Sequence, residues 1–296
     1  MGLTLPAQVL VYGITTGALY GLAAVGLALV FGVMKMLNVA HGSLLMIGAY
    51  AVFWTFSFFH IDPVLSLPLV ALILFAMGIF LYFLVFSPTS KLPEGNRIKN
   101  SLLISFGLML VLDNLAVIFW TGDERSVSPF YSGKAIDLLG VRLSYIGLGG
   151  IVLAVLVIVG LHLFLTRTYF GKSIRATVQD WEAAALAGVN IRSTYLISFG
   201  IGAALAGIAG TLAAVSYAIY PAIGAEWTNK SLIILVLAGV GRIGTVFSAG
   251  LVLGVVEAIS VMFIGSTYRE VVGLVAFIVV LMVRPEGLFM TKRQRR

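Results

Sequence analysis

The sequence predicts an all-α, polytopic integral membrane helical bundle of about eight to nine transmembrane helices, with a short amphipathic helix in a cytoplasmic loop. Three observations support this class. The chain is 60% hydrophobic and only 10% charged, with a mean hydropathy of +1.08, whereas soluble domains carry roughly 25% charged residues. Long apolar runs recur along it, and Lys and Arg gather on one side of them. Long apolar runs also exclude a closed barrel, which needs alternating strands.

A helix needs about 20 apolar residues to cross a bilayer, and nine apolar stretches of the chain have roughly this length. They are 8–33, 39–60, 64–86, 101–120, 144–166, 194–220, 229–247, 248–265 and 268–284. The first stretch is longer than a signal-peptide core of about 7–15 residues and has no basic residue before it, so we expect a retained span. Glycines interrupt 229–265, which is compatible with two spans or with one broken, re-entrant element.

The basic residues set the predicted orientation. If the 167–193 loop faces the cytoplasm, 14 of the 19 Lys and Arg residues fall on that side; the exceptions are Arg125, Lys134, Arg142, Lys230 and Arg269. Because cytoplasmic loops are enriched in Lys and Arg, we predict a periplasmic N-terminus and a cytoplasmic C-terminus. The basic tail 292–296 then lies near anionic lipid, and the net charge of +7 needs no nucleic acid partner.

The chain offers no set of residues for catalysis or metal binding. It has no cysteine, and its three histidines (His41, His60 and His162) have no helical ligand spacing. Gly171-Lys172-Ser173 resembles the end of a phosphate loop, but Thr166 replaces the first glycine. We therefore predict no enzyme activity, no cofactor and no metal. The segments between spans are too short for a second core, so residues 1–296 form a single transmembrane domain.

The 167–193 loop contains a helical pattern. Ile174, Val178, Trp181, Ala185 and Val189 mark an apolar face, with charged residues off it, so we predict one amphipathic helix over 174–189. Such a helix is compatible with an anchor lying in the membrane interface and with a docking helix for a soluble partner.

A group of polar residues lies within the predicted spans. Asn38 and His41 fall near one helical face at the predicted cytoplasmic end of a span, where they either hold a helix start or line a gate. Asp113, on a face with Ser101 and Ser105, has Asn114 beside it, and Glu257 lies on a stripe of glycines. These five (Asn38, His41, Asp113, Asn114 and Glu257) are the candidate pathway or gate residues.

Charged residues in mid-membrane have a cost that limits where they can lie. A charge there costs about 2.5–3.5 kcal/mol on insertion scales. Asp113 and Glu257 should therefore face the interior or a partner. They either line a polar pathway or fix packing through an interhelical hydrogen bond. The two are also compatible with sharing a proton.

Four stretches resemble one family over nearly the whole chain. Glu182-Ala183-Ala184 followed by Gly188 resembles the E-A-A-x-x-x-G signature in the cytoplasmic loop of permease subunits of ATP-binding-cassette importers. "LNVAHGSLLMIGAY" (37–50), "LAGVGRIGTVFSAGLVLGVVEA" (237–258) and "RPEGLF" (284–289) are similar to segments of the branched-chain amino-acid permease family, LivH-type subunit. The family usually has a double glycine at Ala238-Gly239 and often Pro-Gly near Phe247-Ser248, so local helix geometry is open there.

The resemblance implies a permease subunit in the bacterial inner membrane that translocates branched-chain or other hydrophobic amino acids. Its partners would be two ATP-binding subunits that hydrolyse ATP, a second homologous permease and a periplasmic substrate-binding protein. The loop helix then couples to the ATPase through Arg175, Asp180, Glu182, Ala183, Ala184 and Gly188. Permeases for urea, short amides or small organic acids share the pattern. A different class, an ion-coupled secondary transporter, would use Asp113 and Glu257.

Overall fold

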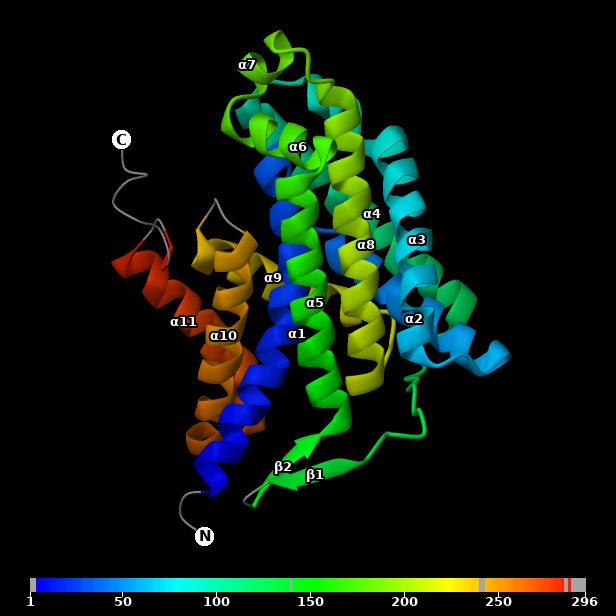
Figure 1. Cartoon of the computed structure of the whole chain (residues 1–296), viewed down its shortest axis with the longest axis vertical. Coiled ribbons are helices and arrows are strands. Elements are labelled where there is room, and N and C mark those ends of the chain that lie inside the picture. Colours follow the sequence, from blue (N-terminus) through cyan, green and yellow to red (C-terminus); the bar gives the residue numbers. More distant parts are fainter. Residues whose placement is uncertain (1–3, 139, 240–242, 285–286, 289–296) are drawn as a thin grey trace.

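The computed structural model describes residues 4–138, 140–239, 243–284 and 287–288 (Figure 1). Its helices are α1 (Thr4–Met34), α2 (His41–Phe59), α3 (Pro63–Leu81), α4 (Glu94–Trp120), α5 (Tyr145–Arg167), α6 (Tyr169–Gln179), α7 (Trp181–Leu186), α8 (Ile191–Ser216), α9 (Ile223–Ala238), α10 (Ile243–Ile264) and α11 (Arg269–Val283). Short helical turns cover Tyr82–Phe86, Thr89–Lys91 and Ser266–Tyr268, and strands β1 (Ala135–Leu138) and β2 (Val141–Ser144) form an antiparallel hairpin. The predicted all-helical membrane bundle is confirmed.

Within the described residues, eight helices are long and apolar enough to span a membrane. α1 and α8 form the buried centre, and α8 packs against α1, α2 and α3. The outer helices expose large apolar side chains, among them Leu103, Ile118, Leu156 and Met282. Because lipid is the solvent on those faces, this exposure agrees with membrane insertion.

Glycines allow α1 and α10 to approach closely. Gly13, Gly17 and Gly21 on α1 face Gly250 and Gly254 on α10. A Cβ atom added to Gly250 would lie 2.4 Å from the Gly21 Cα atom, and one added to Gly254 would lie 2.4 Å from the Gly17 Cα atom. Gly250 and Gly254, which interrupt the apolar run 229–265, therefore pack the continuous helix α10 against α1, as small residues do between membrane helices.

The predicted boundary between 229–247 and 248–265 is wrong. α10 runs unbroken through 247 and 248, whereas α9 ends at Gly239, whose φ is +71°. α9 has 16 residues, fewer than the about 20 of a full span. It begins against the start of α2, where Gly224 meets Gly42, and ends near the C-terminal side of α11, where the Leu288 N–H donates to the Leu237 carbonyl. The non-helical segment 217–222 supplies the rest of this passage.

A second break lies between α1 and α2. Residues 35–40 are not helical, and α2 begins at His41, whose Nε2 atom lies 2.9 Å from the carbonyl oxygen of Ala23, well inside α1. The segment thus returns into the bundle before α2 starts. His41 is the first residue of its span, as predicted, but this helix start lies beside Ala23 of α1, inside the bundle.

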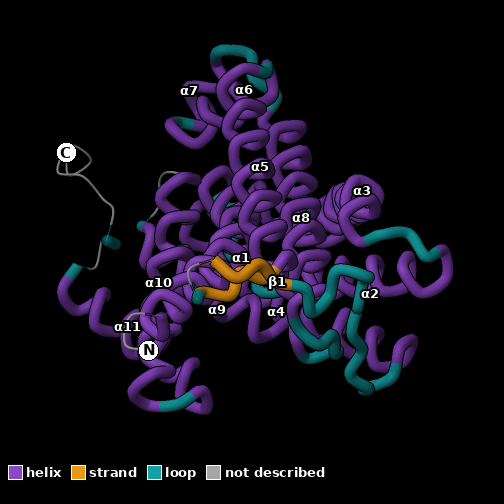
Figure 2. The backbone as a smooth tube through the Cα atoms, turned by 60° about the horizontal axis from the view of Figure 1, so that its bottom comes forward, coloured by secondary structure: helices purple, strands orange, loops and turns teal. Residues whose placement is uncertain are grey.

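The ends of the bundle differ. Figure 1 shows α6 and α7 at one end, with the start of α1 and the hairpin at the other. Figure 2 shows the hairpin crossing that second end, where Gln8 of α1 binds the backbone of Arg142. With the short α9 counted beside the eight helices that are long enough to span a membrane, the described chain has nine such elements, the number of crossings that the sequence predicts. The basic tail 292–296 lies outside the described residues.

Candidate functional site

The starts of α2 and α9 meet in the interior. The backbone N–H of Gly42 donates to the Thr228 hydroxyl oxygen at 2.9 Å, and that hydroxyl donates to the Val39 carbonyl at 2.9 Å. A Cβ atom on Gly42 would lie 1.8 Å from the Gly224 carbonyl oxygen. Glycine is therefore required at position 42, and the two helix breaks are built against each other.

One polar face of α4 holds the segment that returns into the bundle. Ser101 Oγ accepts a hydrogen bond from the Leu37 N–H at 3.0 Å, and Ser105 Oγ accepts one from the Val39 N–H at 2.9 Å. Further along the same face, the Ser43 hydroxyl donates to Asp113 Oδ1 at 2.7 Å. The predicted shared face of Ser101, Ser105 and Asp113 is confirmed. Its contacts are those of an interhelical hydrogen-bond stripe.

The other candidates from this region separate. His41 is buried, with its ring bound to the Ala23 carbonyl, as the structural alternative expects. Asn38 is also buried, but its Oδ1 atom has no hydrogen-bond partner among the described residues. Asn114 is exposed on the outside of α4, where its Nδ2 atom donates to the Leu110 carbonyl of its own helix at 2.7 Å. Of these three residues, Asn38 is the one with a buried side-chain atom that lacks a hydrogen-bond partner among the described residues.

Glu257 on α10 is fully buried within a charged cluster. Its carboxylate accepts hydrogen bonds from Lys230 Nζ on α9, from Arg269 Nε on α11 at 3.0 Å and from the Tyr20 hydroxyl on α1 at 3.1 Å. Asp113 binds Ser43 instead, so the structure does not bring Asp113 and Glu257 together to share a proton, which the sequence had left open. One carboxylate between two cations leaves the Glu257 cluster with an excess of positive charge.

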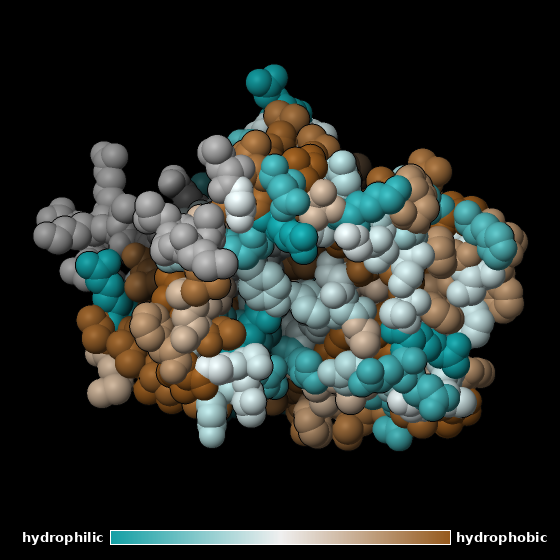
Figure 3. All heavy atoms as spheres, turned by 90° about the horizontal axis from the view of Figure 1, so that it is seen from below, coloured by the Kyte–Doolittle hydropathy of each residue, from teal (hydrophilic) through white to brown (hydrophobic). Residues whose placement is uncertain are grey.

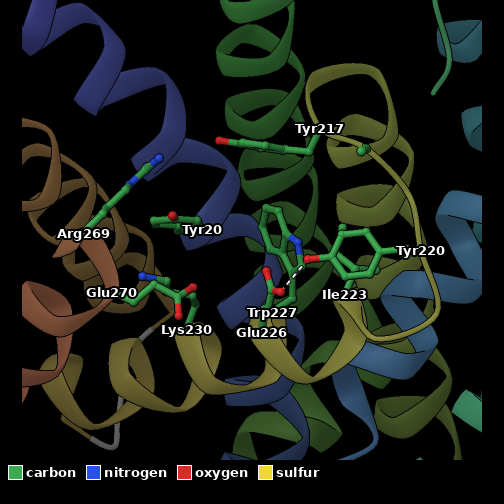
Figure 4. A pocket seen from close by; sticks show the side chains of 10 residues that line it. Tyr20, Tyr217, Tyr220, Ile223, Glu226, Trp227, Lys230, Arg269 and Glu270 are labelled. Carbon is green, nitrogen blue, oxygen red and sulfur yellow. Dashed lines mark hydrogen bonds between the residues drawn. The ribbon is translucent and has the colours of Figure 1, made fainter. Parts of the chain in front are cut away.

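A cavity of about 260 Å³ adjoins the Glu257 cluster (Figure 4). It lies between α1, α9, α11 and the segment after α8, and its lining residues are Tyr20, Tyr217, Ala218, Tyr220, Ile223, Glu226, Trp227, Lys230, Arg269 and Glu270. In the view from the end where α1 begins, polar residues cross the middle of the face between apolar flanks (Figure 3). The cavity is thus a polar recess in an apolar molecule.

Sequence reasoning missed this cavity, although a signal for it was present. Lys230 and Arg269 both fall inside predicted spans, 229–247 and 268–284, and an ionisable residue in a span is by default a functional candidate. In the prediction of orientation, both residues were instead assigned to the segments that connect the spans on the periplasmic side. The rule that selected Glu257 would have selected both.

The loop between α5 and α8 contains two helices, so the predicted single helix over 174–189 is wrong. α6 ends at Gln179, and Asp180 begins α7 by accepting hydrogen bonds from the backbone N–H groups of Glu182 and Ala183, at 2.9 and 3.0 Å. An aspartate at this capping position stabilises a new helix start by about 0.5–2 kcal/mol relative to alanine. The capping side chain explains the break.

Gly188 ends α7 in the left-handed conformation that its sequence position predicts. Its φ is +87°, its N–H donates to the Ala185 carbonyl, and the Val189 N–H donates to the Ala184 carbonyl. These two hydrogen bonds form the Schellman arrangement, in which glycine meets no Cβ penalty. The short helix is therefore capped at both ends.

α7 projects from the bundle while α6 is fixed to it. Arg175, Glu182 and Ala183 are exposed, Ala184 is buried and Leu186 has 92% of its surface exposed. α6 packs against α5, α1 and α8, and a Cβ atom on Gly171 would lie 2.2 Å from the Phe164 carbonyl oxygen of α5. The predicted candidates Arg175, Asp180, Glu182, Ala183, Ala184 and Gly188 thus lie together on or beside this projection.

Comparison with known proteins identifies the family. Residues 9–283 match the family described as the permease component of branched-chain amino acid transport systems. The chain belongs to this permease family. It is 33% identical to the high-affinity branched-chain amino acid transport system permease protein BraD of Pseudomonas aeruginosa, over 95% of this chain and 94% of BraD. It is 27% identical to LivH of Escherichia coli K12, over 93% of this chain and 92% of LivH.

The similarity extends to a more distant relative. The chain is 26% identical to the probable branched-chain amino acid transport permease protein LivH of Methanocaldococcus jannaschii, over 90% of this chain. No solved structure matches the chain. The relatives are permease subunits rather than enzymes, and the apolar helices agree with a multi-pass inner membrane protein.

At the hairpin end of the permease, burial and a nearby carboxylate shift the pKa of one loop tyrosine. Tyr131, in the connection between α4 and α5, donates its hydroxyl to Asp62 Oδ1 at 3.4 Å. Partial burial and the neighbouring carboxylate raise the pKa of Tyr131 to about 12. The phenol therefore stays neutral at physiological pH and ties this connection to the start of α3.

Proposed function

We propose that this chain is the transmembrane permease subunit of an ATP-binding-cassette importer that translocates branched-chain or other hydrophobic amino acids. The observation that supports this most strongly is the 33% identity to BraD over 95% of the chain. The relatives' names favour amino acids over urea, amides or organic acids as cargo. The transporter would contain two ATP-binding subunits, a second homologous permease and a periplasmic substrate-binding protein.

In this proposal α7 is the part that the ATP-binding subunit contacts. Glu182 and Ala183 face outward, the neighbouring Leu186 side chain is almost fully exposed, and both ends of the helix are capped. An apolar side chain beside a fixed charge suits docking of a helix into a groove. Arg175 and Asp180 would set the register of that contact.

Motion of α7 would reach the interior through α6. α6 packs against α1, α5 and α8, and the absence of a side chain at Gly171 brings its backbone against α5. α1 carries Tyr20, and α8 leads directly into the cavity-lining segment after Ser216. Closing of the ATPase pair would therefore shift the helices that border the cavity, which is the switch of access that an importer requires.

The pathway candidates divide within this scheme. Asn38, His41, Asp113 and Glu257 lie in or beside the interior, where the two helix breaks meet or where the charged cluster adjoins the cavity. Asn114 faces outward from α4 and would take part only where the second permease covers that face. We propose that residues 1–296 act as one transmembrane domain, with the N-terminus in the periplasm.

The first test is retention of partners. Tagged chain is solubilised gently from its native membranes, and the retained proteins are identified by mass spectrometry. We expect ATP-binding subunits and a second polytopic permease. With Gly188→Arg, which strains the left-handed cap of α7, the ATP-binding subunits should be lost and the permease kept. Recovery of the chain alone, or with copies of itself only, would contradict the proposal.

A milder variant tests coupling without disturbing the fold. Glu182 is exposed, so Glu182→Lys should insert normally and retain the second permease. Placing a cation on the docking face should lower ATP-driven leucine uptake about tenfold or more. The substitution removes any ion pair that Glu182 makes with the ATP-binding subunit, and the loss of such a pair at an interface costs about 2–5 kcal/mol. Glu94→Lys, at an exposed position at the start of α4, is the matched control. Normal uptake in Glu182→Lys would count against docking through α7.

Reconstitution also separates the importer from an ion-coupled transporter. In proteoliposomes holding the whole complex, leucine uptake should require ATP and continue when proton and sodium gradients are abolished. Glu257 already binds two cationic side chains, which suits a fixed packing role more than a site that exchanges ions. Uptake that follows an ion gradient in the absence of ATP would reverse this conclusion.

A further inference from the structure

The cavity beside Glu257 is lined by side chains of both signs of charge. Lys230 and Arg269 share a single buried carboxylate, so the inner wall is positive in sum. Glu226 and Glu270 also line the cavity, and neither forms a salt bridge among the described residues. Figure 4 shows Glu226 on α9, hydrogen-bonded to Tyr220. A recess lined by both cationic and anionic side chains suits a small molecule that carries both charges.

Arg269 retains unused donor capacity. Its Nε atom binds Glu257 at 3.0 Å, and its Nη1 atom binds the Tyr12 hydroxyl at 3.1 Å. Its Nη2 atom is buried and makes no hydrogen bond within the described chain. Arg269 also lines the cavity, and a carboxylate bound there would give its guanidinium group a charge-assisted hydrogen bond.

The remaining walls of the cavity are aromatic and apolar. Tyr20 and Trp227 meet edge to face with ring centroids 5.6 Å apart, and Ile223 lies at the start of α9 beside them. A volume of about 260 Å³ is near the lower limit of small-molecule pockets, which start at about 300 Å³. The cavity fits one small metabolite with an apolar side chain rather than a peptide.

From this chemistry we infer that the cavity is a subsite for a single zwitterionic, apolar amino acid within the permease. Arg269 and Lys230 would hold the α-carboxylate, Glu226 and Glu270 the α-ammonium, and Tyr20, Ile223 and Trp227 the side chain. The site lies beside the starts of two discontinuous helices, where transporters commonly place substrate. The inference rests on the proposed function and adds to it that this chain itself recognises the head group.

The test is photolabelling of the complete transporter in nanodiscs, followed by peptide mass spectrometry. The probe is a leucine analogue with a diazirine in its side chain and both α-groups intact. We expect labels on Tyr20, Ile223 or Trp227. Excess leucine should suppress them, whereas 4-methylpentanoate, without the amine, and 3-methylbutylamine, without the carboxylate, should not. Equal suppression by all three compounds, or labelling of other residues only, would overturn the inference.

Variants of the cavity keep the test independent of folding. Glu226→Gln and Arg269→Gln should each lower labelling about tenfold or more, the loss expected for one charge-assisted hydrogen bond. Both should fold, since Glu257 keeps Lys230 as a cationic partner when Arg269 is removed. Asp137→Asn, on the exposed hairpin, is the control and should label as the unsubstituted chain does. Unchanged labelling in both cavity variants would also overturn the inference.

Uptake of radiolabelled leucine by the unsubstituted complex separates the two proposals. If the complex imports leucine with ATP and the cavity is not labelled, the subsite is wrong and the proposed function stands. If the complex imports no leucine although the ATP-binding subunits are bound, the proposed cargo is wrong.

Discussion

At the scale of single residues, the Glu257 cluster shows how a membrane protein carries a buried charge. The carboxylate has no exposed surface and is satisfied by two cations and a hydroxyl from three other helices, α9, α11 and α1. Desolvation of several charges at once is costly and is offset only by close, complete pairing. Glu257 therefore joins α10 to its neighbours at one point.

Replacement of Glu257 by glutamine should destabilise the bundle. The side chain keeps its shape, but Lys230 and Arg269 lose their shared counter-charge, and breaking a buried ion pair costs about 3–5 kcal/mol. The measurement is the midpoint of thermal unfolding of the purified permease in detergent. Glu94→Gln, at an exposed position, is the control. An unfolding midpoint for Glu257→Gln equal to that of the control would show that the cluster contributes nothing to stability.

Residue identity predicted part of this site. Glu257 and Asp113 were found because a carboxylate within an apolar run is rare, and Gly188 because it completes the E-A-A-x-x-x-G signature. Partners were not predictable, since Tyr20 lies 237 positions from Glu257 along the chain. Pairing of Glu257 with Lys230 and Arg269 rather than Asp113 depends on helix packing that spacing in the sequence does not record.

At the scale of elements, the two interrupted helices are the main departure from the sequence-based prediction. Hydropathy locates apolar runs but not the depth at which a helix starts. The predicted span 39–60 agrees with α2, but the sequence does not show that His41 lies beside Ala23 in the interior. A broken helix is tolerated in a membrane only where other groups satisfy the freed backbone. In the structure those groups are the hydroxyls of Ser101 and Ser105 on α4 and of Thr228 on α9. In the sequence these three residues are far apart and nothing marks them as partners of the segment 35–40.

Removal of the α4 serines should expose this dependence. In Ser101→Ala with Ser105→Ala, the N–H groups of Leu37 and Val39 lose their acceptors, each at a cost of about 1–3 kcal/mol. We expect a lower unfolding midpoint and faster proteolysis between α1 and α2. Ser260→Ala, whose hydroxyl binds only its own helix, is the control. If the double variant unfolds and is cleaved as the control is, α4 does not hold the returning segment.

At the scale of the whole molecule, the distribution of Lys and Arg along the chain predicts which loops lie at the same end of the bundle. The bias of Lys and Arg to one side predicted that the loop holding α6 and α7 lies at the end of the bundle opposite the start of α1, and Figure 1 shows this arrangement. Miscounted boundaries in 229–265 did not alter it, because the short α9 still makes one passage. Relative sidedness is robust where helix boundaries are not.

The absolute orientation can be measured directly because the chain has no cysteine, so a single introduced thiol has no background. Ser132→Cys lies in the exposed connection before the hairpin, and Ala187→Cys lies beside the exposed end of α7. In intact cells a membrane-impermeant maleimide should label Ser132→Cys at once, and Ala187→Cys only after the membrane is permeabilised, because positive loops stay inside. Denatured samples of both variants control for thiol reactivity. The reverse pattern would place α7 outside the cell, out of reach of any ATP-binding subunit, and the coupling proposed for this permease would fail with it.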